Sequence, residues 1–148
     1  MPMRVRIRIE GADEVLRALD KLPSDARREL KDKMQDVSEE LARKIKAAGA
    51  ARGRQAARVA RTVKALRGVT PIVQASNPGK RTLLGSEFGM TRHSGWYAAG
   101  RYSRDHSPQY YPHNNEGYWF FPTARAEQPH MAEQWHEVAA AVVRDWSA

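Results

Sequence analysis

All twelve aromatic residues of this 148-residue chain lie after position 87. The first half must therefore build its share of the hydrophobic core from aliphatic side chains. The second half carries nearly all of the large contact area that Trp and Tyr provide, which suits either a core or a surface that binds a partner. From the sequence, both interpretations stay open.

Several Trp and Tyr residues of the second half are candidates for contacts with neighbouring subunits or other partners. They are Trp96, Tyr97, Tyr102, Tyr110, Tyr111 and Trp119.

The length predicts a single domain, residues 1–148, large enough to bury about 68–70% of the surface of its unfolded chain. Cysteine is absent, which excludes disulfides, thiolate nucleophiles and thiolate metal sites. The N-terminus lacks the apolar stretch of a signal peptide, and no run approaches the length of a membrane span. We therefore expect a soluble protein made in the cytosol, without a membrane partner.

The net charge of +8 is concentrated in the middle of the chain. Residues 41–86 contain eleven Lys and Arg and no acidic residue. This block favours a polyanion or an acidic protein face as partner, and composition does not choose between them. If the piece around Arg54 is helical, its spacing of four and then three residues to Arg58 and Arg61 makes one cationic stripe. The candidate contacts are Arg52, Arg54, Arg58, Arg61 and Lys64.

Hydrophobic periodicity predicts the elements of the first half. Alternation of basic and aliphatic residues over 4–10 is typical of a strand whose basic face is solvated or meets a partner. A short helix follows over 12–21, and a helix over 24–48, about 37 Å long, carries a narrow apolar stripe and partly projects beyond its sheet. The stripe consists of Leu30, Met34, Val37, Leu41 and Ile45. Residues 62–66, 69–75 and 83–88 read as further strands.

Residues 89–117 show no sustained period and are predicted to form a long aromatic-rich loop or arm. Pro122 and Thr123 then open a helical tail whose apolar stripe faces the rest of the domain, and Pro129 is expected to restart this helix. The predicted fold class is α+β, with a small antiparallel sheet packed with one long helix and a C-terminal helix.

The sequence predicts no catalytic, cofactor or metal site. The five histidines lack ligand spacing, and no serine lies in a nucleophile elbow. Glu87 is the one acid among apolar neighbours, and a lone carboxylate there is more often a cap or a salt-bridge partner than a general base. An enzyme is therefore not expected.

Two short motifs follow the basic block: Gly-Ser-Glu-Phe-Gly at 85–89 and Gly-Tyr-Trp-Phe-Phe-Pro-Thr-Ala-Arg at 117–125. Together with the opening strand, the Leu-rich helix and the long charged helix, they resemble the neck or tail-completion proteins of long-tailed bacteriophages, a family of head-tail joining and minor tail components. In that family the first motif ends a sheet strand and the second leads into the last helix. The structural positions fall on Glu87, Phe88, Gly89, Phe121 and Pro122.

The resemblance implies a non-enzymatic virion protein, assembled in the bacterial host cytoplasm, that forms a ring, expected to be a hexamer, and joins the tail to the DNA-filled head. Its implied partners are copies of itself and neighbouring neck and tail proteins, such as a head-closure or connector protein, a tail terminator or the tail tube. The basic segment would face these rings or the DNA in the lumen. Two alternatives stay open: a tail terminator that caps the tube, and, from a different class, a sequence-independent nucleic-acid-binding protein.

Overall fold

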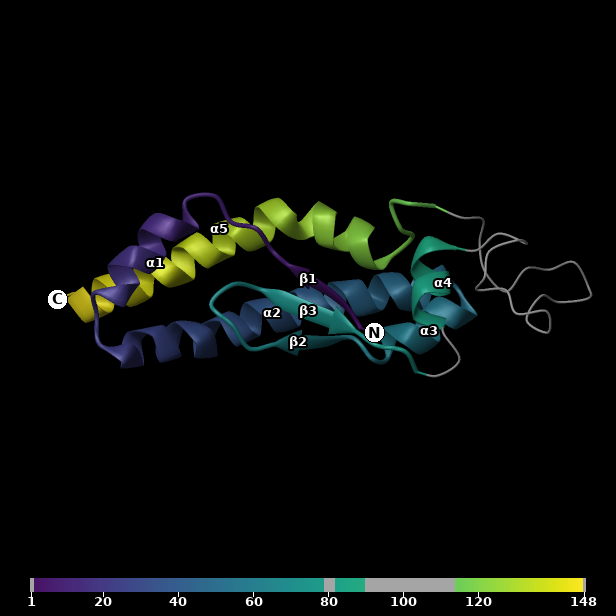
Figure 1. The fold of residues 1–148 in the computed structure, drawn as a ribbon, viewed down its shortest axis with the longest axis horizontal. Helices are drawn as coiled ribbons and strands as arrows, with labels where there is room; N and C mark the ends of the chain where they lie inside the picture. The colour runs from purple at the N-terminus through teal and green to yellow at the C-terminus, as the bar shows by residue number, and fades with distance from the viewer. Residues whose placement is uncertain (1, 79–81, 90–113, 148) are drawn as a thin grey trace, which may run out of the picture.

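The structure is a computed structural model that describes residues 2–78, 82–89 and 114–147. In Figure 1, two long helices run along the long axis, a small sheet lies beside the middle of one of them, and short helices stand at the ends. The elements, in order, are β1 (Met3–Arg6), α1 (Ala12–Asp20), α2 (Ser24–Arg52), α3 (Arg54–Ala60), β2 (Lys64–Leu66), β3 (Ile72–Ala75), α4 (Thr82–Phe88) and α5 (Phe120–Ser147).

The sheet is antiparallel, with strand order β1-β3-β2. Alternate side chains point to opposite faces, so Val73 is fully buried on the face that packs on α2, whereas its neighbour Gln74 belongs to the outer face. The register places Arg4 and Lys64 on either side of Gln74. The three strands predicted at the start of the chain and in the basic block are confirmed, with shorter bounds.

The predicted stripe of α2 is buried along its whole length and forms one side of the core. The helix continues beyond residue 48 to Arg52. Gly49 lies within it and allows close packing, because a Cβ there would lie 2.8 Å from both Trp119 and Ala60. The end of α2 that extends past the sheet is covered by α1 and α5 (Figure 1). It therefore packs within the fold and does not project as a bare arm.

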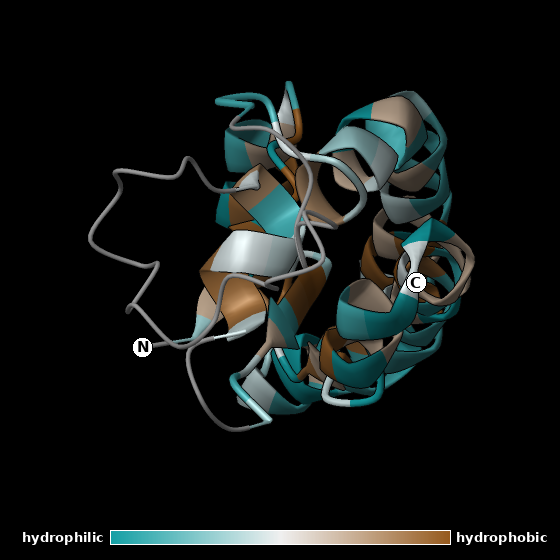
Figure 2. Ribbon diagram, turned by 90° about the vertical axis from the view of Figure 1, so that its right-hand side faces the viewer, coloured by the Kyte–Doolittle hydropathy of each residue, from teal (hydrophilic) through white to brown (hydrophobic). Residues whose placement is uncertain are grey.

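Helix α5 packs along α2 and supplies the other side of the core. Its buried stripe includes Met131, Trp135 and Val142, and the Trp135 indole N–H donates to the Val69 carbonyl of the β2–β3 turn (2.5 Å). Figure 2 shows hydrophobic residues of the helices facing the interior and hydrophilic ones outside. Pro129 does not restart the helix as predicted but lies inside one continuous helix.

The prediction of a strand over 83–88 is wrong, because these residues form the short helix α4. Both ends of this helix contact residues outside it. The Leu83 N–H donates to Oδ1 of Asn77 (2.8 Å), and the side chain of Glu87 caps the start of α5. The Glu-Phe-Gly element accordingly ends a helix here and not a sheet strand.

The described residues form an α+β fold, as predicted, with a small antiparallel sheet packed with one long helix and a C-terminal helix. None of the helices in this part of the chain combines the length and apolar character that crossing a bilayer requires.

Candidate functional site

A buried carboxylate joins the two motif segments. Glu87 has no solvent exposure. Its Oε1 accepts hydrogen bonds from the backbone N–H groups of Tyr118 (2.5 Å) and Trp119 (2.9 Å), and its Oε2 accepts one from Phe121 (3.0 Å). The Phe121 N–H lies in the first turn of α5, where a helix leaves backbone donors without partners, and the other two N–H groups directly precede the helix. We call Glu87 together with these three N–H groups the Glu87 anchor.

Burial and hydrogen bonding have opposite effects on the pKa of Glu87 in the anchor. Burial raises the pKa of Glu87 above its ordinary value, while the backbone N–H groups of residues 118–121 act in the opposite direction by favouring the ionised form. The positive end of the α5 dipole favours negative charge at the same place. The anchor thus joins two chain segments.

Gly117 makes room for the Glu87 carboxylate. Its φ is +89°, and a Cβ at this position would lie 2.5 Å from Oε1 and 2.8 Å from Cδ of Glu87. Beside it, the rings of Phe88 and Phe121 stack with centroids 5.8 Å apart. The structure therefore gathers the residues predicted to be structural: Glu87, Phe88, Gly89, Phe121 and Pro122.

The described residues that flank segment 90–113 meet beside the Glu87 anchor. The Asn114 N–H donates to the Phe88 carbonyl (2.7 Å), which closes the chain across this segment. A turn over 114–117 then leads into α5, with the Glu116 N–H donating to Oδ1 of Asn114 (2.9 Å). This junction lies at the end of the molecule that carries α3 and α4 (Figure 1).

The aromatic candidates divide into two groups. The structure corrects the prediction that Trp119 contacts a partner. Trp119 is 1% exposed and packs its ring against Gly49 in the core, so it offers no surface to a partner. The other five lie outside the described residues and stay predictions; they are Trp96, Tyr97, Tyr102, Tyr110 and Tyr111.

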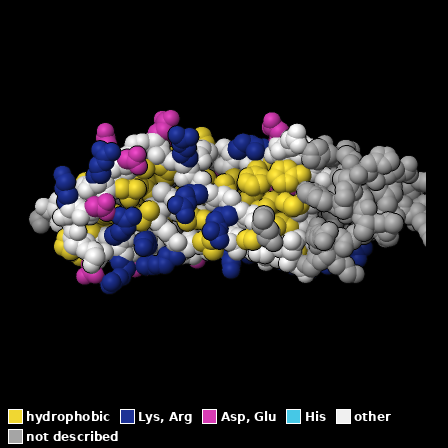
Figure 3. Space-filling model, in the orientation of Figure 1, with side chains coloured by type: hydrophobic (Ala, Val, Ile, Leu, Met, Phe, Trp, Pro, Cys, Tyr) yellow, Lys and Arg dark blue, Asp and Glu magenta, His cyan; other side chains and the backbone are white. Residues whose placement is uncertain are grey.

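The predicted cationic residues are largely on the surface. Helix α3 carries Arg54 and Arg58, and Arg61 directly follows its last residue; these three arginines are exposed, as is Lys64 on β2. None of these four makes an ion pair with a carboxylate of the described residues. Arg52 differs, since its guanidinium lies 4.6 Å from the centre of the Tyr118 ring and is half-buried. Figure 3 shows Lys and Arg side chains across the face that carries the sheet.

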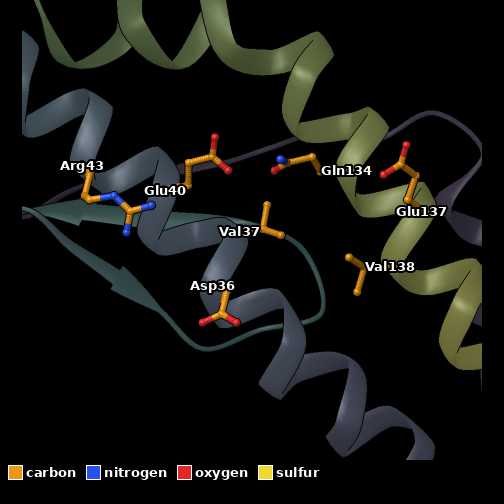
Figure 4. A pocket seen from close by; sticks show the side chains of 7 residues that line it. All are labelled: Asp36, Val37, Glu40, Arg43, Gln134, Glu137 and Val138. Carbon is orange, nitrogen blue, oxygen red and sulfur yellow. The ribbon is translucent and has the colours of Figure 1, made fainter.

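A polar groove of about 370 Å³ lies between α2 and α5. In Figure 4 the amide of Gln134 points across it toward the carboxylate of Glu40. Desolvation acts to raise the pKa of Glu40, but hydrogen bonds from Gln134, His130 and Lys44 outweigh it and lower that pKa. No group of three potential ligands suited to a metal ion occurs among the described residues. Polar contacts across the groove therefore connect the two long helices.

The sequence did not reveal which glycines make room for close contacts with distant residues. Gly49 admits the Trp119 ring and Gly117 admits the Glu87 carboxylate, although neither partner is near in sequence. The signal for Gly117 was its place directly before the aromatic run. Gly49, in contrast, stands among alanines and gives no signal of its partner.

Comparisons with protein-family models, curated proteins and solved structures found no match to this chain.

Proposed function

We propose that this protein is a structural subunit of the head-tail interface of a long-tailed bacteriophage, where it forms a ring that completes the tail and joins it to the head. The observation that carries the proposal is the Glu87 anchor. It unites the Glu-Phe-Gly and aromatic-Pro motifs on which the family resemblance rests, although 31 residues separate Glu87 from Tyr118.

The anchor also supports the idea of an arm between subunits. A ring subunit must contact like neighbours on two sides and unlike rings above and below, which favours contacts that reach beyond a compact body. The joined ends at Phe88 and Asn114 give segment 90–113 one fixed base on the α+β body. That segment contains five of the nine Trp and Tyr residues of the chain, the types enriched at interface hot spots.

Omission of the protein tests this role. In a phage that lacks the gene, we expect filled or emptied heads and separate tails, and we expect complementation with the wild-type chain to restore joined particles. Joined, infectious particles without the protein would overturn the proposal. Tails of uncontrolled length would instead indicate the tail terminator, and normal particles with a defect confined to host nucleic acid would indicate the nucleic-acid-binding alternative.

A further inference from the structure

Basic side chains from two distant segments lie on the outer face of the sheet. In the register, Arg4 stands opposite Gln74, and Gln74 stands opposite Lys64. The Arg4 guanidinium donates to Oε1 of Gln74 from Nη2 (2.7 Å) and Nε (3.2 Å), which holds it against the sheet. Arg6 projects to the same face because it is two residues further along β1. We call Arg4, Arg6 and Lys64 the sheet-face cations.

Nothing in the described structure neutralises these charges. All three side chains are exposed, and none forms an ion pair with a described carboxylate, whereas the nearby Arg67 is paired with Asp32. Residues 1–9 and 62–76, which supply the strands, contain no Asp or Glu. A surface of unpaired like charges attracts a partner of the opposite charge, and its potential is strongest toward a polyanion.

The composition of this face favours nucleic acid over protein. Besides the cations and Gln74, this face carries Ile72, which is buried, and Leu66, which is half-buried, so its exposed side chains are mainly cationic. Nucleic-acid interfaces are more polar and far more positively charged than protein interfaces, whose centres are apolar and aromatic. The strands contain no aromatic residue, so the face offers no platform on which single-stranded bases could stack. Exposed cations on adjacent strands suit contacts with phosphates, which position a protein without reading sequence.

We infer that the outer face of the sheet binds the phosphate backbone of duplex nucleic acid, without sequence preference, through the sheet-face cations. In the proposed neck this duplex would be the DNA that passes through the ring. DNA binding by the isolated protein is measured without phage particles. A negative result would therefore not change the outcome of the omission experiment, which tests the proposed function.

The test is fluorescence anisotropy of the full chain with two short DNA duplexes of unrelated sequence, over salt from about 50 to 200 mM. The variant Arg4→Gln/Arg6→Gln/Lys64→Gln is compared with the control Arg17→Gln/Lys21→Gln/Lys46→Gln, which removes the same charge from exposed, unpaired positions on and beside the helices. Circular dichroism first confirms that both fold.

We expect the sheet-face variant to bind at least about tenfold more weakly and to lose up to about 2.7 from the slope of log K against log salt, since each phosphate contact contributes about 0.9. The control should stay within about twofold of the wild type. If the triple variant does not fold, Lys64→Gln alone should lower the slope by about 0.9.

Four results would overturn the inference: no binding by the wild type, equal losses in variant and control, a strong preference between the two duplexes, or tighter binding of single strands. If the wild type does not bind DNA and the sheet-face variant is not incorporated into phage particles, this face would instead be assigned to an acidic protein partner.

Discussion

At the scale of single residues, Glu87 holds together parts of the chain that local sequence does not connect. Burying a carboxylate is costly unless hydrogen bonds compensate for the lost water. Three backbone N–H groups at the start of α5 do so, and they in turn would be left unpaired without Glu87. Each side of the contact thus depends on the other, and the contact is expected to respond sharply to substitution.

Replacing Glu87 with Gln tests this dependence. The amide keeps one acceptor oxygen but brings an NH₂ group against backbone donors, so Glu87→Gln is expected to lower the free energy of unfolding by about 1–3 kcal/mol. Urea denaturation measures the change. Glu116→Gln is the control, because the Glu116 side chain is 83% exposed. Equal stability of the two variants would contradict a structural role for the anchor.

Gly117 provides a second test at this scale, with Gly11 as its matched control. Both residues have positive φ, +89° and +75°, so an alanine at either pays a similar backbone cost. A Cβ at Gly11 has its nearest neighbour, His136 Cε1, at 3.6 Å, whereas at Gly117 it meets the Glu87 carboxylate at 2.5 Å. Gly117→Ala should therefore destabilise by about 1–3 kcal/mol more than Gly11→Ala in thermal or urea unfolding. A smaller loss at Gly117 would mean that the carboxylate moves aside freely.

At the scale of elements, the sequence predicted the helices and strands whose hydrophobic pattern keeps a sustained period. The alternation over 4–10 and the long stripe of α2 each repeat over several residues, and both elements form, although β1 covers only Met3–Arg6 and α2 extends to Arg52. Helix α4 was misread as a strand because seven residues including Gly85 hold too short a pattern to separate the two periods. Its conformation depends on Asn77 and on α5, which no local pattern shows. The site followed the same rule: the sequence pointed to the two motifs, but their meeting through Glu87 was not predictable from local pattern.

Pro129 makes a prediction about α5 as an element. Inside a helix, proline lacks the N–H that would bond the carbonyl of Arg125, four residues earlier, and its ring crowds that carbonyl. Since Pro129 is exposed, Pro129→Ala should stabilise the protein, by up to about 3 kcal/mol, without loss of packing. Differential scanning calorimetry measures the change. A lower melting temperature would show that α5 needs Pro129 to pack along α2.

At the scale of the whole molecule, the described α+β body and segment 90–113 have separate roles in this account. Trp119 belongs to the core, so Trp119→Ala should cost about 3–5 kcal/mol of stability. Trp96 and Tyr97 are predicted partner contacts, so Trp96→Ala/Tyr97→Ala should reduce incorporation into particles while changing the free energy of unfolding far less. Urea titration and immunoblots of purified particles separate the two effects. Normal incorporation of the double variant would contradict the interface prediction.

Taken together, the body is an elongated α+β unit whose two long helices enclose the core, with a basic sheet face and a fixed base for segment 90–113. These features suit a subunit that is held by neighbours on several sides. Closed symmetric rings make the copy number a small fixed integer.

The most direct measurement is therefore absolute quantification of this protein in purified particles by mass spectrometry with labelled peptide standards, scaled to the portal protein. A sixfold neck ring predicts a few copies per particle, about half the portal count. Absence from finished particles, or a count in the range of major capsid or tube proteins, would contradict the proposed place in the neck.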